Sequence, residues 1–212
     1  MLHSFYYPIA RVEFPEYLGR QHYMHEFDPM HPTMPRGFED YIPMACKLAD
    51  AMGVIDPIFI TIDEKIVQSG QSQRRPGPHV DGCFIPTKPE AKAKAEAESL
   101  TVKLDDNFTG YWGHQPYGSG WNHYCNAVPM KRMPVIVASS VAGCRVWEGS
   151  FDAEPQNDGD LSHIWDDLGK GVVLPANTAY LLSPDCVHES MVFNEPTQRQ
   201  FIRLALPVNT PI

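Results

Sequence analysis

Two imidazoles and one carboxylate stand out in this chain as a set that could bind a metal ion. His79 and Asp81 lie in the sequence PHVDG (residues 78–82), and His188 ends the sequence PDCVH (residues 184–188). Residues i and i+2 of a strand project from the same face, so His79 and Asp81 can hold one ion together. With His188 as the third ligand, three positions of an octahedral ion stay open for other molecules.

Short strands bounded by turns are expected to position these ligands. The sequence RRPGP before His79 is typical of a turn that leads into a strand. Residues 172–175 and 179–182 are predicted to be strands, and the turn after them places His188 near the start of a strand over 189–193. Residues 200–206 form the clearest strand pattern in the chain.

A cation lies inside that last apolar strand. Arg203 shares one strand face with Phe201 and Arg199. A guanidinium buried in an apolar run is costly unless an anion or hydrogen bonds compensate it. By itself the pattern is more typical of a structural ion pair or a solvated edge. Beside three metal ligands it favours an anionic ligand, bound by Arg199 or Arg203.

With these residues the chain resembles the superfamily of 2-oxoglutarate and Fe(II)-dependent oxygenases. Its members carry His-x-Asp, a distal His and, a short distance further on, an Arg or Lys that binds the far carboxylate of 2-oxoglutarate. His79, Asp81 and His188 match the metal positions. Arg199 and Arg203 lie 11 and 15 residues past His188, and both offsets occur in the superfamily. The resemblance falls within residues 76–206.

The resemblance implies a double-stranded β-helix, or jelly roll, that binds Fe(II) and uses 2-oxoglutarate as its cosubstrate. In that chemistry 2-oxoglutarate is decarboxylated to succinate and a C–H bond of the substrate is oxidised. The substrate would be a small molecule or a side chain, and the sequence does not identify it.

Two other classes of protein remain open. One is a cupin-type metalloenzyme that does not use 2-oxoglutarate, because residues 184–188 with Asn194 resemble the second cupin motif, although the His-x-His of the first motif is absent. The other is a non-catalytic jelly roll that acts as an interaction module. In that case His79 and His188 are core histidines.

Length and composition predict one globular domain, and about eight short strand patterns separated by Gly/Pro turns predict a mainly β fold. The chain has 212 residues, 43% of them hydrophobic. We expect a jelly-roll core over 54–207, preceded by an N-terminal flank (1–53) with a helix over 38–52 that Gly53 ends. Residues 133–140 and 143–149 are predicted to form a hairpin of core strands.

An insertion is expected within this core, over residues 88–126. It begins with a segment rich in Ala, Lys and Glu (88–103), predicted to be a solvated helix or a mobile excursion. Residues 108–124 then mix aromatic rings with glycines, which suits either a loop packed over the core or a wall that faces the substrate. The candidates for this wall are Tyr111, Trp112, Trp121 and Tyr124.

Charge and hydropathy argue against several partners. The chain has 26 acidic and 17 basic residues and a net charge of −9, which argues against general binding of nucleic acids. No stretch approaches the roughly 18 apolar residues of a membrane span, and the first residues lack the pattern of a signal peptide. The five cysteines include no Cys-x-x-Cys, so reduced thiols in a cytoplasmic protein are expected.

Overall fold

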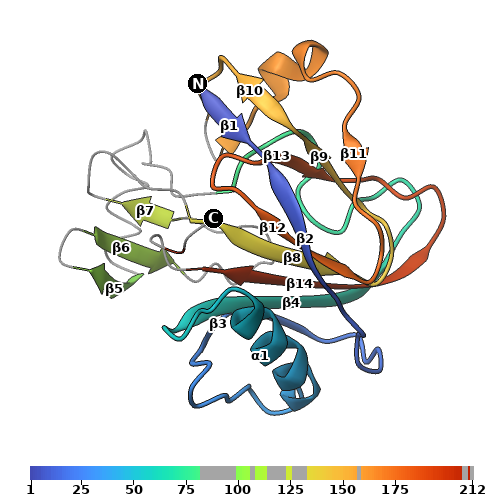
Figure 1. The fold of residues 1–212 in the computed structure, drawn as a ribbon. Coiled ribbons are helices and arrows are strands. Elements are labelled where there is room, and N and C mark those ends of the chain that lie inside the picture. Colours follow the sequence, from blue (N-terminus) through green and yellow to red (C-terminus); the bar gives the residue numbers. More distant parts are fainter. Residues whose placement is uncertain are drawn as a thin grey trace.

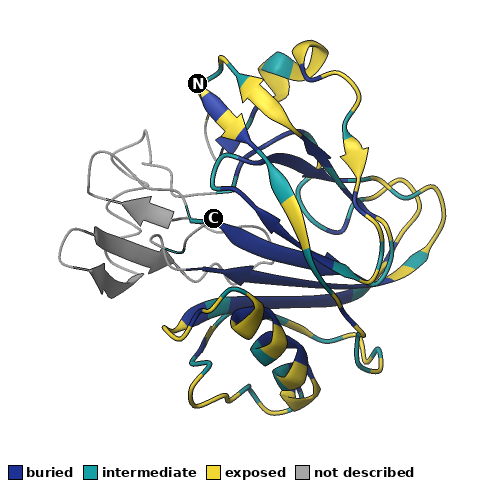
Figure 2. Ribbon diagram, viewed as in Figure 1, coloured by how far each residue is buried: buried dark blue, intermediate teal, exposed yellow. Residues whose placement is uncertain are grey.

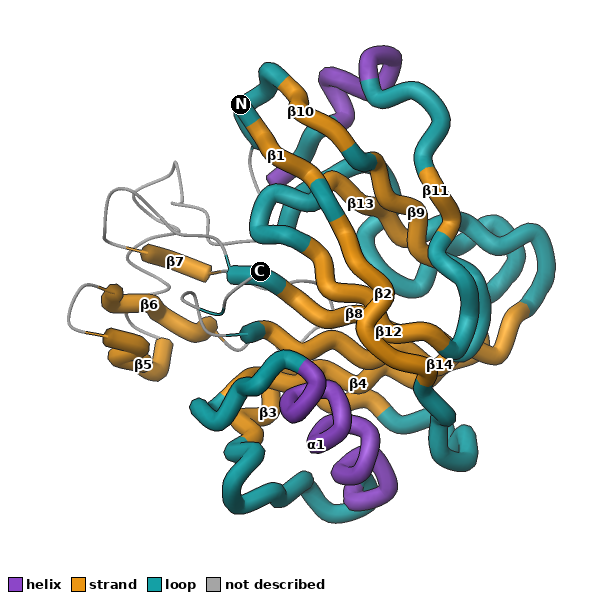
Figure 3. Tube along the Cα trace, in the orientation of Figure 1, coloured by secondary structure: helices purple, strands orange, loops and turns teal. Residues whose placement is uncertain are grey.

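A computed structural model describes residues 1–81, 133–156, 159–206 and 210, and it describes the backbone alone over 99–105, 108–113 and 123–125. Antiparallel strands make up most of the regular secondary structure among the described residues, and helices are few (Figure 3). This confirms the expected mainly β class. None of the described helices is long and apolar enough to cross a membrane.

The larger sheet has six strands among the described residues, in the order β2-β12-β8-β14-β4-β3 (Figure 1). Its central strand β14 pairs antiparallel with β8 on one side and β4 on the other. The bounds are β2 (Tyr6–Arg11), β3 (Gln21–Phe27), β4 (Ile58–Val67), β8 (Val135–Ser139), β12 (Thr178–Leu182) and β14 (Thr197–Ala205).

A smaller sheet carries the strand that contains His188. Strand β9 (Cys144–Trp147) lies between β11 (Val172–Val173) and β13 (Val187–Ser190). Beyond β13 the backbone at His79 bridges His188 on one side and Asp160 on the other, which extends this layer by two short segments. The segment that carries His79 is therefore held between two backbone neighbours.

Two further small sheets complete the described strands. Strand β1 (Leu2–Ser4) pairs with β10 (Gly149–Phe151). The strands β5 (Ser99–Asp105), β6 (Phe108–Gly113) and β7 (His123–Cys125) pair with one another.

Alternation along β14 sends its side chains into two different hydrophobic clusters, one on each side of the larger sheet. Ile202 and Leu204 lie in the cluster that contains buried residues of helix α1 (Ile42–Ala51), whereas Phe201 and Ala205 lie in a second cluster with Val146 of the smaller sheet. We call this second side, which faces the smaller sheet, the inner face. The central strands β4, β8 and β14 are buried almost throughout, whereas the outer surface of α1 is exposed (Figure 2).

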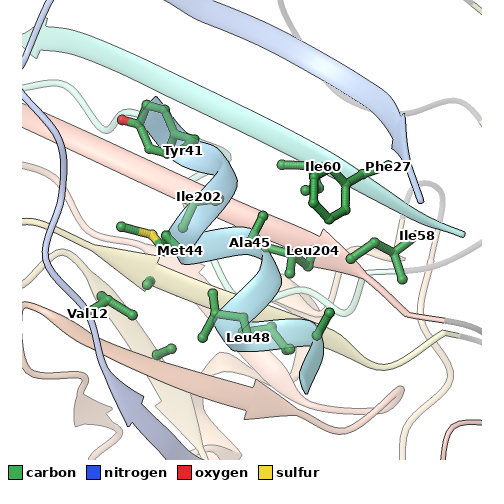
Figure 4. Packing of buried hydrophobic residues seen from close by; sticks show 14 of the residues in the cluster. Val12, Phe27, Tyr41, Met44, Ala45, Leu48, Ile58, Ile60, Ile202 and Leu204 are labelled. Atoms are coloured by element: carbon green, nitrogen blue, oxygen red, sulfur yellow. The ribbon is translucent and has the colours of Figure 1, made fainter. Parts of the chain in front are cut away.

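Helix α1 (Ile42–Ala51) covers the opposite side of the larger sheet, as Figure 4 shows. It follows a single 3-10 turn, η1 (Glu39–Tyr41), and begins with Pro43 in its first turn, where a missing N–H costs no helical hydrogen bond. It ends at Ala51, and Gly53, just past the C-cap residue Met52, has a φ of 62°. The expected helix over 38–52 is thus confirmed, with Tyr41, Met44, Ala45 and Leu48 buried as its apolar spacing required.

The expected hairpin over 133–149 is wrong. Strand β8 belongs to the six-stranded sheet and β9 to the smaller sheet, so the turn between them crosses from one layer to the other. Both strands are buried apolar runs. Such a run does not show whether the strand that follows it in the sequence also pairs with it in a sheet.

Two other expectations differ from the structure. The N-terminal flank 1–53 contains three strands besides its helix, and two of them, β2 and β3, are the edges of the larger sheet. Their sequences include Pro8 and a polar, histidine-rich run, which edge strands tolerate and core strands do not. Residues 88–103 were expected to be a solvated helix or a mobile excursion; from Ser99 onward they form strand β5 instead, and residues 88–98 lie outside the described part.

Candidate metal centre

Two histidines from distant parts of the sequence meet as backbone partners. The amide N–H of His79 donates to the carbonyl of His188 at 2.9 Å, and the amide of His188 donates to the carbonyl of His79 at the same distance. This reciprocal bonding defines a hydrogen-bonded antiparallel pair, whose side chains lie on one face. The two imidazole centroids are consequently 4.5 Å apart.

Both imidazoles have the same hydrogen-bond arrangement. Nδ1 of His79 lies 2.8 Å from the carbonyl oxygen of Gly77, and Nδ1 of His188 lies 2.9 Å from that of Cys186. A carbonyl can only accept, so each Nδ1 carries a hydrogen, and in the neutral form of either ring the lone pair is on Nε2. Metal-binding histidines are commonly fixed in this way, with the second ring nitrogen donating to a carbonyl.

The carboxylate of Asp81 completes the group. Among the described residues, one ligand atom from each of His79, Asp81 and His188 lies within 4.8 Å of the other two. Nε2 of His188 is 3.7 Å from Oδ2 of Asp81. The three residues therefore converge as expected from the spacing, and two imidazole nitrogens with one carboxylate are donors that suit a divalent transition metal.

The charge states also suit metal binding. Burial, with a smaller contribution from neighbouring His188, lowers the pKa of His79 from 6.5 to about 3. Burial would raise the pKa of Asp81, but nearby Arg203 and the two imidazoles together hold it well below its usual range. At neutral pH the group therefore offers a neutral His79 and an ionised carboxylate, the forms that coordinate an ion.

Arg203 contacts this carboxylate directly. Its Nη1 lies 2.6 Å from Oδ2 of Asp81, and only 9% of the Arg203 side chain is exposed. Arg203 reaches the site from β14 of the larger sheet, whereas Asp81 follows the segment beside β13. Of the two arginines expected to bind an anion, this one already has an anionic partner within the protein.

Arg199 has a different environment on the same face of β14. Its Nε donates to Oγ of Ser139 at 2.8 Å, and its Nη1 donates to Oγ of Ser190 at 3.3 Å. The guanidinium carbon lies 5.7 Å from the ring centroid of Phe193 and 5.5 Å from that of Phe201. Arg199 is 1% exposed, and no carboxylate among the described residues forms an ion pair with it.

The strand register confirms that both arginines face inward. Arg199 lies opposite Lys65 and Arg203 lies opposite Thr61 of β4, and the residue between them, Phe201, belongs to the inner cluster. Ile202 packs with α1 on the other side. The expected division of this strand into two faces is therefore confirmed.

Two hydroxyl groups of this site were not anticipated from the sequence. Ser190 is two residues past His188, so the same period of two that links His79 to Asp81 could have drawn attention to it. Ser139 ends β8, and nothing in its local sequence distinguishes it. Both hydroxyls meet at Arg199 because three strands bring them together.

The expected aromatic wall cannot be placed. Tyr111 and Tyr124 are backbone partners in β6 and β7, and Trp112 is the partner of His123. Their side chains, together with the whole of Trp121, lie outside the described part of the structure.

Comparisons with known proteins give no family assignment. A scan against family models, a search of curated proteins and a search of solved structures each found no match to this chain.

Proposed function

We propose that the protein is a non-haem Fe(II) oxygenase that uses 2-oxoglutarate as its cosubstrate to oxidise a C–H bond of a small molecule or a side chain. The observation that carries this proposal is the environment of Arg199. A buried cation with two hydroxyl partners and no described carboxylate is strongly disfavoured unless an anion joins it. Such an anion would lie beside a group of residues suited to hold a metal ion.

The cation remains charged in this setting. Burial lowers the pKa of Arg199 from 12.5 to about 10, which leaves the guanidinium protonated at neutral pH. Two of its nitrogens already donate to Ser139 and Ser190. A planar guanidinium has further N–H groups that can donate to a carboxylate, and charge-assisted bonds of this kind are among the strongest in proteins.

The spacing between Arg199 and the metal ligands suits a dicarboxylate. Ser190, which accepts a hydrogen bond from Arg199, lies two residues past His188 on the same strand. Two strand residues span roughly 7 Å. A five-carbon oxo-dicarboxylate can bind the ion at its oxoacid end and reach Arg199 with its other carboxylate.

In this proposal His79, Asp81 and His188 hold Fe(II) through two Nε2 atoms and the carboxylate. Bound iron supplies the redox chemistry by which dioxygen oxidises the oxoacid and then the substrate. Overall, 2-oxoglutarate, dioxygen and a C–H bond give succinate, carbon dioxide and a C–OH group. The protein binds and orients the oxoacid, and the clusters around the site limit the access of water.

The arrangement of the sheets is consistent with the finer fold that this function implies. The six-stranded sheet and the layer formed by β11, β9, β13 and the segment at His79 enclose one core between them (Figure 1). The turn after β8 carries the chain from one layer to the other. We propose that these layers are the two sheets of a double-stranded β-helix.

Anaerobic calorimetry tests the proposal. 2-Oxoglutarate should bind the Fe(II)-loaded protein, and Arg199→Met should weaken that binding by about ten- to a hundredfold, because one charge-assisted contact is lost. Arg145→Met is a matched control. Arg145 forms an ion pair of 2.9 Å with Glu189, and this pair does not lie on the inner face.

The other outcomes point to the alternatives. Binding of Fe(II) without any affinity for 2-oxoglutarate would support a cupin-type metalloenzyme. Absence of metal binding would leave the interaction module, with His79 and His188 as core histidines.

A further inference from the structure

We propose that Arg74 is a specificity-determining residue that binds an anionic group of the substrate, such as a carboxylate, sulfonate or phosphate. This inference rests on the oxygenase function proposed above and names the class of substrate for the same site. Arg74 lies five residues before His79, in a segment beside β13. Its amide donates to Oγ of Ser190 at 3.2 Å, the same hydroxyl that accepts a hydrogen bond from Arg199.

The side chain of Arg74 crosses from this segment to the larger sheet. Its guanidinium carbon lies 5.7 Å from the ring centroid of Phe201 on β14 and 5.5 Å from that of Tyr23 on β3. Its Nη1 lies 3.7 Å from Oδ2 of Asp63 on β4. Phe201 also contacts the guanidinium of Arg199, whose carbon is 5.5 Å from the ring centroid. Two cations from different segments therefore meet at one ring of the inner face.

These contacts orient the guanidinium of Arg74 without using all of its hydrogen bonds. Both rings lie within the distance of about 6 Å at which cation–π attraction is significant. The distance of 3.7 Å to Asp63 is that of an ion pair and is too long for a hydrogen bond. Even with the neighbouring hydroxyl of Tyr23 as a further partner, only some of the guanidinium N–H groups are engaged. The others can donate to an anionic ligand, for which a planar guanidinium is well suited.

Exposure distinguishes Arg74 from Arg199. Arg199 is buried, whereas 18% of the Arg74 side chain is exposed. A ligand that enters from solvent therefore meets Arg74 before Arg199. The deeper cation suits the cosubstrate, and the more accessible one suits a substrate that binds after it.

The charges around Arg74 also favour an anion. Burial lowers the pKa of Arg203, and the positive charge of Arg74 lowers it further. Burial is likewise the main cause of the lowered pKa of Arg199, to which Arg74 contributes. Cations this close to one another cost free energy that a further negative charge offsets. A site lined by one sign of charge also attracts ligands of the opposite sign.

Paramagnetic relaxation by Mn(II) tests the proposal with benzenesulfonate as the probe, a monoanion that is a weak metal ligand. The protein is loaded with Mn(II) and 2-oxoglutarate, so that the oxoacid occupies Arg199. Protein-bound Mn(II) should then relax the ring protons of benzenesulfonate in a saturable way, but not those of methyl phenyl sulfone, a neutral compound of similar shape. Arg74→Met should weaken the binding of benzenesulfonate by about ten- to a hundredfold, because one charge-assisted contact is lost.

Two matched variants separate this role from a structural one. Arg145→Met removes a guanidinium that also lies near a ring, 6.0 Å from that of Trp147, and that also pairs with a carboxylate, but away from the inner face. It should leave the binding of benzenesulfonate unchanged. Asp63→Asn breaks the same ion pair as Arg74→Met, yet it should bind benzenesulfonate at least as tightly as the wild type, because Arg74 keeps its charge and loses a competing anion. If Arg74→Met fails to fold, Arg74→Gln serves for the same comparison.

Three results would overturn the proposal. The first is a wild-type protein that shows no saturable relaxation of benzenesulfonate. The second is equal affinity for benzenesulfonate in the wild type and Arg74→Met, and a loss of 2-oxoglutarate affinity in that variant would then make Arg74 part of the cosubstrate site. The third is an equal weakening by Asp63→Asn and Arg74→Met, which would leave Arg74 only a structural partner of Asp63.

Failure of the proposed function has a different signature. A wild-type protein that binds Mn(II) but no 2-oxoglutarate refutes the oxygenase, and the comparison is then made without the oxoacid and with Arg199→Met included. Relaxation that is lost in Arg74→Met and kept in Arg199→Met still assigns the anion to Arg74, and the reverse pattern overturns that assignment. If the protein binds no Mn(II), broadening of the benzenesulfonate resonances by the protein itself makes the same comparison.

Discussion

His79 and His188 are joined by two reciprocal backbone hydrogen bonds, each 2.9 Å long, although the two residues lie 109 positions apart in the sequence. The pairing fixes the two imidazoles on one face before any ion is bound. Their Nδ1 atoms are held by the carbonyls of Gly77 and Cys186. The candidate centre is therefore organised by the backbone, and its occupation by a metal should require little rearrangement.

The first prediction concerns this pair. His79→Ala should lower the affinity for Fe(II) by more than about a hundredfold, because loss of a ligand costs more than loss of a residue that only orients one. The fold should persist, since the backbone bonds of residue 79 do not need the imidazole. Anaerobic metal titration measures the effect, and His163→Ala, on the exposed turn η3 (Ser162–Asp167), is the control. Equal affinities in the two variants would remove His79 from the site.

The second prediction concerns pH and the metal-free protein. The folded protein holds the pKa of His79 at about 3, against 6.5 for an ordinary histidine. Below about pH 6 the unfolded chain therefore binds a proton that the folded protein excludes, and stability falls as the pH decreases. One such proton contributes a slope of up to about 1.4 kcal/mol per pH unit.

Urea denaturation in the presence of a chelator, at intervals from about pH 7 to pH 4, measures this slope. The lowered pKa of Asp81 also makes stability fall with decreasing pH, but only at pH values near or below the ordinary pKa of an aspartate. It therefore does not obscure the effect of His79 at higher pH. His79→Gln should show a smaller decline over that interval than the wild type. A decline of the same size in both proteins would contradict the assignment of a neutral buried imidazole.

The third prediction tests the anion site without changing its charge. A Cβ added at Gly143 would lie 2.7 Å from Cζ of Phe193 and 3.0 Å from Cζ of Arg199. Gly143→Ala should therefore displace the guanidinium and weaken 2-oxoglutarate binding while sparing the affinity for Fe(II). Gly171→Ala creates similar crowding against Arg145 and Trp147 and is the matched control. If both variants bind 2-oxoglutarate like the wild type, Arg199 is not the anchor.

The fourth prediction concerns the stability of the sheet that carries Arg199. On its helix-covered side, buried Glu64 accepts hydrogen bonds from the Tyr41 hydroxyl at 2.7 Å and from the amide of Leu18 at 2.9 Å. Tyr41→Phe should lower the free energy of unfolding by about 1–3 kcal/mol, because a buried carboxylate loses a donor. Denaturant unfolding measures the loss, and Tyr7→Phe, at an exposed tyrosine, should change little.

The sequence indicates the three candidate metal ligands, which the structure brings together, because their signal is local. His79 and Asp81 need only a strand, and His188 needs only a turn before the next strand. The roles of the two arginines could not be separated in this way. Arg199 and Arg203 share one face of one strand, and only the pairing of β14 with its neighbours places one beside Ser190 and the other beside Asp81.

The parts of the fold that could be predicted are those that depend on local sequence alone. Strand β14 and helix α1 follow from apolar periodicity within single segments. The layer change between β8 and β9, and the use of β2 and β3 as sheet edges, depend on pairing between distant segments. Local pattern does not encode that pairing.

The most direct test of the central claim is turnover of the cosubstrate. Purified protein supplied with Fe(II), ascorbate, dioxygen and 2-oxoglutarate should form succinate slowly even without its substrate, because the missing C–H donor only uncouples the reaction. Asp81→Ala should abolish both iron retention and succinate formation. Succinate formed by the wild type and not by Asp81→Ala would support the oxygenase. A wild-type protein that retains iron but forms no more succinate than Asp81→Ala would contradict it.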